Sequence, residues 1–384
     1  MIPIDFQKRR TRLSMKVKEK GFDAYLVTRQ GGLHYLCGVF MPWRGVAIVT
    51  ANNQFALIYW TGDATRIIQE GAPMEVIEFN NSDMFEKTKA KLREFGLTSG
   101  KLAFDLALPG NAQPAPGMMT AAEYIEAQTT FKDFQICNGV TCLDELLMIK
   151  DEAELERLRK AASIADYAYD TALKNIHTGM TENQIAGILE HASRDKGSYW
   201  AWSVTAGTEV GSGPRTAFAH GVTQISSERR IQQNEFIIID FHPCYDLYLC
   251  DYSIPAFIGT PNEQQKILID CWEEALKTVF DAIHPGVRIC DAVAKGIEVY
   301  KKYGLYDYCF PRFGHGLGVC VRTGPLLNLN NKGIFRTGMT FAFGAHLYMP
   351  GVGGLRLEYP VAVGKENAEQ LAKTAMKVHF VPLR

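Results

Sequence analysis

The sequence predicts two domains, an α/β domain over about residues 1–145 and an α+β domain over about residues 150–384. Three observations support this fold class. A chain of 384 residues is longer than a single hydrophobic core usually serves. Short apolar runs alternate with amphipathic segments as far as about residue 140, whereas strand-like runs dominate after about residue 193. Between them the charged, helix-forming segment MIKDEAELERLR, residues 148–159, marks the boundary.

The elements of the first domain follow from its apolar pattern. A basic amphipathic helix is expected from Asp5 to Lys20, and its basic face is interpreted as solvated rather than functional. A short apolar strand, Ala24–Thr28, is followed by the pair Gly31–Gly32 and by a second apolar run, Val46–Thr50. Strands then alternate with helices up to about residue 140.

The second domain opens with a long helix that runs from the boundary segment to about Lys174. Gly179 can end that helix, and Thr181 can cap a second helix that reaches about Ser193. Two further helices, near 262–282 and 288–303, precede a last group of strands.

Composition excludes several classes of protein. The chain has 41 basic and 42 acidic residues and no long run of either sign, so a nucleic-acid partner is not expected. Its nine cysteines include no CxxC pair, which favours a reducing compartment without a disulfide framework. No stretch approaches the ~18 apolar residues of a membrane span. The composition therefore predicts a cytoplasmic protein with a small-molecule ligand and no membrane partner.

Two carboxylates stand at the strand pair expected near Asp240 and Asp251. They are eleven residues apart, so a hairpin can bring both to one point. Carboxylates forced together repel unless a cation or a proton lies between them. Asp240 follows three isoleucines, and a carboxylate at the end of a buried strand needs a partner. Two aspartates on the wet face of a hairpin are the alternative interpretation.

Two later motifs add candidate ligands. His315 lies within FGHGLG, where glycines allow close backbone approach and leave the imidazole accessible. Glu358 ends the segment GGLRLE beside Arg356. Each alone has a structural interpretation, a packed histidine and a strand-face ion pair of little energy. The combination carries more weight.

The order Asp240, Asp251, His315, Glu358, with these flanking residues, resembles the pita-bread enzymes, which include methionine aminopeptidase, aminopeptidase P, prolidase and creatinase. The resemblance extends over about residues 145–365, through IKDEAELERLRKAASIAD, HTGMTENQIAGILE and FRTGMTFAF, and more weakly over the N-terminal domain. It implies a pita-bread fold for the C-terminal domain and a homodimer.

In the metal-dependent members of that family, five residues hold two divalent ions. The resemblance implies that Asp240 binds one ion, that Asp251 and Glu358 bridge both, and that His315 binds the other. The fifth ligand, a glutamate in the family's IEPGIY strand, is Gly344 here. The site is therefore expected to hold Mn, Fe, Co or Zn. Both two ions and a single ion stay open as alternatives. His346, on the same strand face, is an alternative nitrogen ligand.

The resemblance also implies residues that touch the substrate. His220 aligns with a proton-transfer histidine, and Arg322 replaces a second histidine, where a guanidinium can hold a substrate carboxylate. The candidate substrate contacts are Trp43, Arg44, Trp200, Trp202 and Arg356. Tryptophan faces can bind a cation, although core packing is the alternative for these aromatic residues.

The leading hypothesis is a hydrolase that cleaves a C–N bond of an Xaa-Pro dipeptide or a small amide or amidine. A metal ion would lower the pKa of a water molecule, and His220 would assist proton transfer. Three alternatives stay open. They are a metal-independent, creatinase-like hydrolase of a small zwitterion, a metal-dependent lyase of an onium acid such as dimethylsulfoniopropionate, and an inactive binding module.

Overall fold

The computed structural model describes residues 1–80, 82–108, 116–199, 207–218, 225–319 and 323–383. The chain forms two compact units. The N-terminal unit is Pro3–Leu147, and the C-terminal unit is Met148–Arg384 together with Met1 and Ile2. Among the described helices, none is long and apolar enough to cross a membrane.

The N-terminal unit is built on one six-stranded sheet in the order β4-β3-β2-β1-β5-β6. β1 pairs antiparallel with β2 and parallel with β5, so the sheet is mixed. All four residues of β1 are buried, as expected for a strand at the centre of a covered sheet. The strands are β1 (Ala24–Val27), β2 (Gly45–Thr50), β3 (Phe55–Trp60), β4 (Val76–Phe79), β5 (Gly100–Phe104) and β6 (Phe134–Asn138).

Helices pack around this sheet. The expected first helix is present, and the Asp5 carboxylate caps it by accepting a hydrogen bond from Lys8 N at 2.8 Å. The Gly31–Gly32 pair lies within a helix, and the apolar run Val46–Thr50 belongs to β2. The helices are α1 (Phe6–Glu19), α2 (Gln30–Cys37), α3 (Ala64–Glu70), α4 (Met84–Glu94), α5 (Ala121–Thr130) and α6 (Val140–Leu147), with a 3₁₀ turn η1 at Thr61–Asp63.

Among the described residues of the C-terminal unit, three of the four long helices begin at a side-chain cap. Asp151, Thr181 and Asn262 each form a capping box with the residue three positions on. Thr181 therefore caps the second helix as expected, although the first helix already ends at Asn175 and Gly179 occupies a left-handed turn at φ 88°. The helices are α7 (Glu152–Asn175), α8 (Glu182–Asp195), α9 (Glu263–Phe280) and α10 (Ile289–Lys302), with 3₁₀ turns η2 (Gly213–Ala217) and η3 (Tyr306–Tyr308).

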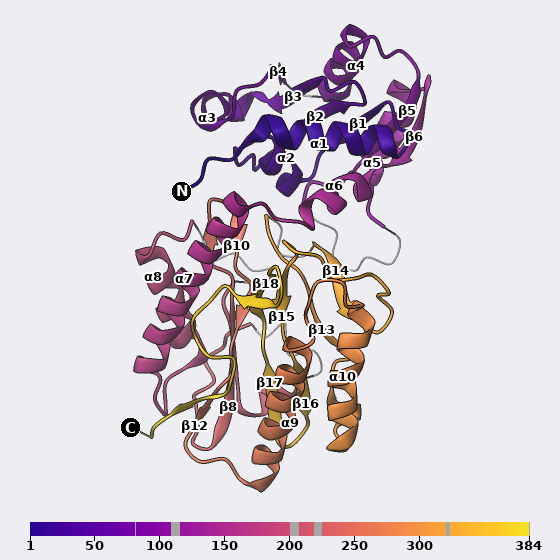
Figure 1. Cartoon of the computed structure of the whole chain (residues 1–384). Helices are drawn as coiled ribbons and strands as arrows, with labels where there is room; N and C mark the ends of the chain where they lie inside the picture. Colours follow the sequence, from indigo (N-terminus) through magenta and orange to yellow (C-terminus); the bar gives the residue numbers. More distant parts are fainter. Residues whose placement is uncertain (81, 109–115, 200–206, 219–224, 320–322, 384) are drawn as a thin grey trace. The chain divides into compact units, whose positions relative to one another are not determined.

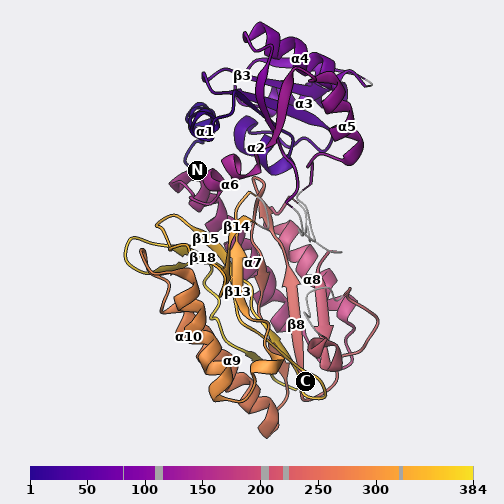
Figure 2. The same cartoon turned by 90° about the vertical axis from the view of Figure 1, so that its right-hand side faces the viewer.

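The strands of the C-terminal unit lie between the two helix pairs. α7 and α8 cover one side and α9 and α10 the other, an α+β arrangement visible in two orthogonal views (Figures 1 and 2). One sheet has the order β11-β8-β12-β20 with β7 beside β8, and another has the order β14-β13-β15-β18-β19. Two short pairs, β10-β9 and β16-β17, complete the set.

The two larger sheets bring their carboxylate- and histidine-bearing strands together at the centre of the unit. The strands are β7 (Glu209–Ser212), β8 (Glu235–Phe241), β9 (Cys244–Tyr245), β10 (Tyr248–Leu249), β11 (Tyr252–Ser253), β12 (Ala256–Ile258), β13 (Arg312–Gly316), β14 (Thr323–Asn328), β15 (Thr340–Phe343), β16 (His346–Met349), β17 (Gly353–Arg356), β18 (Tyr359–Val363), β19 (Ala368–Gln370) and β20 (His379–Val381).

Candidate metal centre

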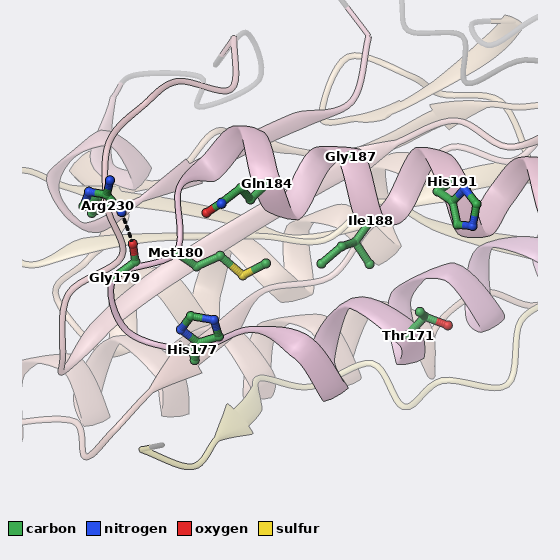
Figure 3. Close-up of a pocket in the computed structure, with 9 residues that line it drawn as sticks. All are labelled: Thr171, His177, Gly179, Met180, Gln184, Gly187, Ile188, His191 and Arg230. Carbon is green, nitrogen blue, oxygen red and sulfur yellow. Dashed lines mark hydrogen bonds between the residues drawn. The ribbon is translucent and has the colours of Figure 1, made fainter.

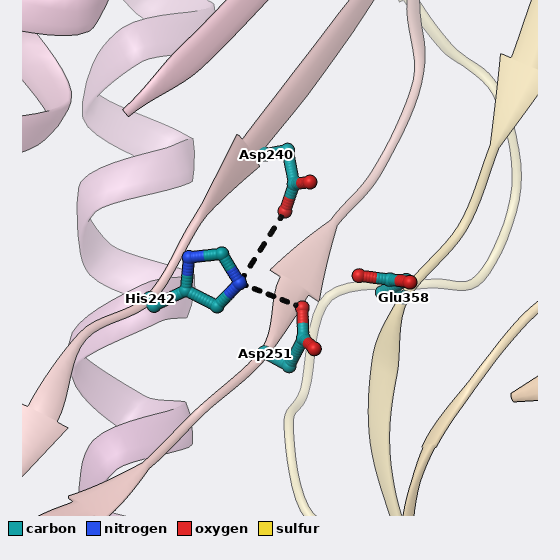
Figure 4. Close-up of side chains that lie close together, drawn as sticks. All are labelled: Asp240, His242, Asp251 and Glu358. Carbon is teal, nitrogen blue, oxygen red and sulfur yellow. Dashed lines mark ion pairs between the residues drawn. The ribbon is translucent and has the colours of Figure 1, made fainter. Parts of the chain in front are cut away.

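The hairpin that carries the two aspartates also carries a histidine. β8 and β11 pair antiparallel with Asp240 opposite Ser253 and Phe241 opposite Tyr252. Continuing this register by one residue sets His242 opposite Asp251. The side chains meet, because His242 Nε2 lies 3.1 Å from Asp251 Oδ1 and 3.9 Å from Asp240 Oδ1. Figure 4 shows the three side chains converging. All three are buried.

Glu358 reaches the same point from the C-terminal strands. It forms an antiparallel bridge with Ser253, which pairs with Asp240, so four segments lie side by side in register. In Figure 4 the Glu358 carboxylate faces Asp251. Glu209 on β7 pairs with Asp240 on its other side and is also buried. The carboxylates therefore converge because of strand pairing rather than sequence proximity.

His315 comes from β13, where two glycines let the strands approach. Gly314 has φ 129°, and a Cβ there would meet Ala342 O at 2.1 Å. His315 Nε2 lies 3.3 Å from Asp251 Oδ2 and 3.9 Å from Glu358 Oε1. Its Nδ1 lies 3.1 Å from Gly316 O, and a hydrogen bond donated there leaves Nε2 with a free lone pair. His315 is fully buried.

A buried arginine lies between two of the carboxylates. Arg356 Nη2 is 3.0 Å from Asp240 Oδ2 and 2.7 Å from Glu358 Oε2, and the residue is only 1% exposed. The strand-face ion pair expected from the sequence is thus an interior one, in which charge interactions are much stronger than at a surface. Its second partner, Asp240, is distant in sequence.

The buried groups shift one another's pKa values. Burial alone would raise the pKa of Asp251, but the imidazoles of His242 and His315 hold it well below its usual range. Burial raises the pKa of Glu358, where Arg356 opposes the rise and Asp251 adds to it. Burial would lower the pKa of His242, yet Asp251 raises it to about 9. The neighbouring imidazoles and the Arg356 guanidinium thus stabilise the charged form of the buried carboxylates.

The donor set fits a divalent ion. Asp240, His242, Asp251 and Glu358 each offer one atom to a buried group whose members all lie within 4.8 Å of one another. Donors that share one ion lie roughly 3 to 4.2 Å apart, since each lies ~2.1 Å from it. Carboxylate and imidazole are the donors that Mn, Fe, Co and Zn accept.

The strand that lacks the expected glutamate leaves no room for one. Gly344 lies between β15 and β16, and a Cβ built there would meet Leu357 O at 1.6 Å. His346 lies on β16 with its Nε2 4.0 Å from Glu358 Oε1. Burial and the charge of Arg356 hold the pKa of His346 well below its usual value, so its imidazole is neutral. His346 borders the cluster.

The other sequence-predicted site residues fall in two places. His220, Arg322, Trp200 and Trp202 lie outside the described residues. Trp43 and Arg44 belong to the N-terminal unit, where Trp43 is 59% exposed with its ring centroid 5.2 Å from that of Trp60. Arg44 donates to both carboxylate oxygens of Glu123 at 2.5 Å.

Sequence reasoning did not single out His242. The signal was its position two residues after Asp240, because that spacing returns a strand side chain to the same face. The proline that follows made the segment read as a turn.

A separate hollow lies on α8 and the end of α7. Its volume is about 580 Å³, and Figure 3 shows that its lining residues come from the two helices, from the turn between them and from Arg230. Arg230 closes one end by donating to Gly179 O at 2.7 Å. None of the cluster residues lines it. The metal centre is therefore distinct from this hollow.

Comparison with known proteins agrees with the fold and the cluster. Residues 156–365 match the profile of metallopeptidase family M24, and residues 9–134 match that of the creatinase/prolidase N-terminal domain. An Xaa-Pro dipeptidase of Pyrococcus furiosus is 25% identical over 370 residues, which cover 96% of this chain and 98% of that protein.

Solved structures share the fold. An Xaa-Pro dipeptidase from Bacillus anthracis has a TM-score of 0.86 at 23% identity, covering 98% of this chain and all of the other. An X-Pro aminopeptidase from Thermotoga maritima has a TM-score of 0.83 at 23% identity, covering 97% and 99%.

Fold and site together define a metallohydrolase with the pita-bread fold, as predicted from the sequence. The chain belongs to metallopeptidase family M24. Its chemistry is peptidase-type hydrolysis of a C–N bond, and its cofactor is a divalent metal.

Proposed function

We propose that this enzyme is a dipeptidase that hydrolyses the amide bond of Xaa-Pro dipeptides. The observation that carries the proposal is the buried cluster of Asp240, Asp251, His315 and Glu358, held by strand pairing in a chain whose full-length relatives include Xaa-Pro dipeptidases. Within the proposal these four residues are the metal ligands. The metal is Mn, Fe, Co or Zn.

The bound ion supplies a Lewis acid that makes water nucleophilic at neutral pH. The chain's own residues do the rest. Asp240, Asp251 and Glu358 keep their carboxylates fixed and dry, so they need little reorganisation when the substrate binds. Water adds to the amide carbon, the C–N bond breaks, and the leaving proline nitrogen takes a proton, for which His220 is the proposed donor.

Arg322 is proposed to bind the terminal carboxylate of the dipeptide, because a guanidinium holds a carboxylate by two hydrogen bonds. Trp200, Trp202 and Arg356 remain proposed substrate contacts. As in the resembling family, the proposed enzyme is a homodimer, and Trp43 and Arg44 contribute to substrate binding.

The test combines metal analysis with a substrate panel. Purified protein is loaded separately with Mn, Fe, Co and Zn, its metal content is measured, and its hydrolysis of Leu-Pro is compared with that of Leu-Ala. The panel also contains amidines and onium acids. Metal-dependent cleavage that prefers Leu-Pro by ~100-fold or more supports the proposal. Turnover of only an amidine or an onium acid would replace it with one of the alternative reactions.

A second outcome concerns the metal itself. If the protein takes up none of the four ions, the dipeptidase proposal fails, and a creatinase-like reaction centred on His220 becomes the hypothesis to test. Size-exclusion chromatography with light scattering tests the homodimer separately from the reaction.

A further inference from the structure

We propose that the cluster binds a single divalent ion with His242 as one of its ligands, while the Arg356 guanidinium supplies the positive charge that a second ion would otherwise bring. This inference shares with the proposed function only the assumption that the cluster binds a metal ion. It adds a ligand that the sequence comparison did not assign, and it fixes the number of ions.

The position of His242 is the first step of the argument. Its Nε2 lies 3.1 Å from Asp251 Oδ1 and 3.9 Å from Asp240 Oδ1. Both distances fall within the roughly 3 to 4.2 Å that separates donors around one ion. The histidine is 5% exposed and directly follows the ladder between β8 and β11. Its ring reaches the other donors without a change in the backbone.

His346 is the other candidate histidine ligand, and it is less well placed to bind the same ion. Its Nε2 lies 4.0 Å from Glu358 Oε1, whereas His242 Nε2 lies within that distance of two carboxylates. The His346 ring instead packs at 6.0 Å from the ring of Phe310 and 6.3 Å from that of Tyr348. It therefore serves as a matched comparison, a buried imidazole beside the same carboxylates but outside the group of four.

Arg356 is the second step. Its Nη2 contacts Asp240 Oδ2 and Glu358 Oε2, two oxygens that face away from those nearest His242 and His315. A guanidinium is charged at every accessible pH. Counting only the ligand carboxylates, Asp240, Asp251 and Glu358 carry three negative charges. Arg356 cancels one, and one divalent ion balances the other two.

The third step of the argument concerns the glutamate that the family has at the position of Gly344. With Arg356 in place, two divalent ions would need more carboxylates than these three for neutrality, and Gly344 cannot be replaced by one because Leu357 O lies 1.6 Å from the Cβ position. Leu357 N also donates to Ala345 O at 3.1 Å, which holds the two backbones together. The backbone of Leu357 therefore leaves no space for a ligand side chain at position 344.

Metal binding without substrate provides the test. Metal-free protein is titrated with Mn²⁺ by calorimetry, and bound metal is counted after desalting. The wild type is expected to bind one ion per chain. His242→Gln is expected to bind Mn²⁺ at least ~100-fold more weakly, and His346→Gln within ~3-fold of the wild type. Two ions in the wild type, or equal affinity in His242→Gln, would overturn the inference.

Pulsed EPR of the Mn²⁺-loaded wild type needs no variant and guards against a variant that fails to fold. Coupling to two imidazole nitrogens, those of His242 and His315, is expected. Coupling to only one contradicts the role of His242.

Arg356→Gln tests the charge argument, with Arg356→Lys as the control that keeps the charge. The first variant leaves one carboxylate charge unbalanced, so it is expected to bind its single ion at least ~10-fold more tightly, and the second is expected to keep the wild-type affinity. Equal affinity in both variants would mean that Arg356 does not supply the balancing charge. These binding experiments contain no substrate, so they test the metal site alone. If the protein binds one ion but cleaves no dipeptide, only the proposed function fails.

Discussion

The backbone of Glu358 forms two hydrogen bonds with Ser253. Ser253 N donates to Glu358 O at 2.7 Å, and Glu358 N donates to Ser253 O at 2.9 Å. Ser253 also pairs with Asp240. This bridge joins the aspartate hairpin to the C-terminal strands, and it sets the Glu358 carboxylate beside Asp251. A change to a cluster side chain should therefore alter metal binding while the strand pairing that places it persists.

Asp251→Asn should abolish metal binding. The substitution keeps the shape of the side chain but removes a buried negative charge that His242 and His315 both face. Stoichiometric metal and at least ~100-fold of the dipeptidase activity are expected to be lost. Elemental analysis and the Leu-Pro assay measure both. Asp270→Asn, on the exposed face of α9, is the control, and equal metal content in the two variants would refute the assignment.

Glu182→Ala should destabilise the C-terminal unit. The fully buried carboxylate accepts hydrogen bonds from Ser212 and Ser227, at 2.5 to 3.1 Å, and lies 3.2 Å from Arg215 Nε. Removing it leaves the buried Ser212 and the partly buried Ser227 and Arg215 without this acceptor, so the free energy of unfolding should fall by ~3–5 kcal/mol.

Urea unfolding followed by circular dichroism measures the effect of this change. Glu190→Ala, at an exposed position of the same helix, is the control and should change stability by less than ~0.5 kcal/mol. A similar small effect for Glu182→Ala would mean that its hydrogen bonds contribute little.

Gly344→Ala should destabilise the protein even without metal, because the added Cβ would meet Leu357 O. A loss of ~3 kcal/mol is expected, and Gly344→Glu should lose more without gaining a second ion. Gly187→Ala is the contrast, since its Cβ meets nothing within 4 Å in a helix and should stabilise by up to ~1 kcal/mol. Thermal unfolding of metal-free protein compares them. An unchanged melting temperature for Gly344→Ala would show that the strands can separate.

Glu123 should make the N-terminal unit sensitive to acid. Burial alone would raise the pKa of Glu123, but hydrogen bonds from Arg44 and from Thr120 N lower it below the usual 4.5. A lowered folded-state pKa adds stability above pH 4.5 that is lost as the pH falls through the folded value. At pH 7 the lowered pKa therefore adds to the free energy of unfolding.

Urea unfolding of wild type and Glu123→Gln between pH 7 and pH 3 tests this prediction. The wild type should be the more stable at pH 7, and the difference should shrink as the pH falls below 4.5. Glu126→Gln, at an exposed position of α5, should show no such trend. A difference that does not vary with pH would assign the effect of Glu123 to packing instead.

Several features could be predicted from the sequence because they follow from local chemistry. Asp240 after three isoleucines needs a buried partner, and His315 among glycines needs close backbone approach; the structure has both features. The caps at Asp5 and Thr181 were also predictable, because a side-chain oxygen at a helix start satisfies nearby backbone donors. His242 and the burial of Arg356 were not predicted.

By itself the sequence determined the order and spacing of the cluster residues, the loss of a carboxylate at Gly344 and the succession of helices and strands, because these depend on residues near one another in the chain. Only the tertiary structure decided that His242 faces Asp251, that Arg356 reaches Asp240 and that Leu357 O closes the space at Gly344. Strand register decides these contacts, since a shift of one residue turns every side chain to the opposite face.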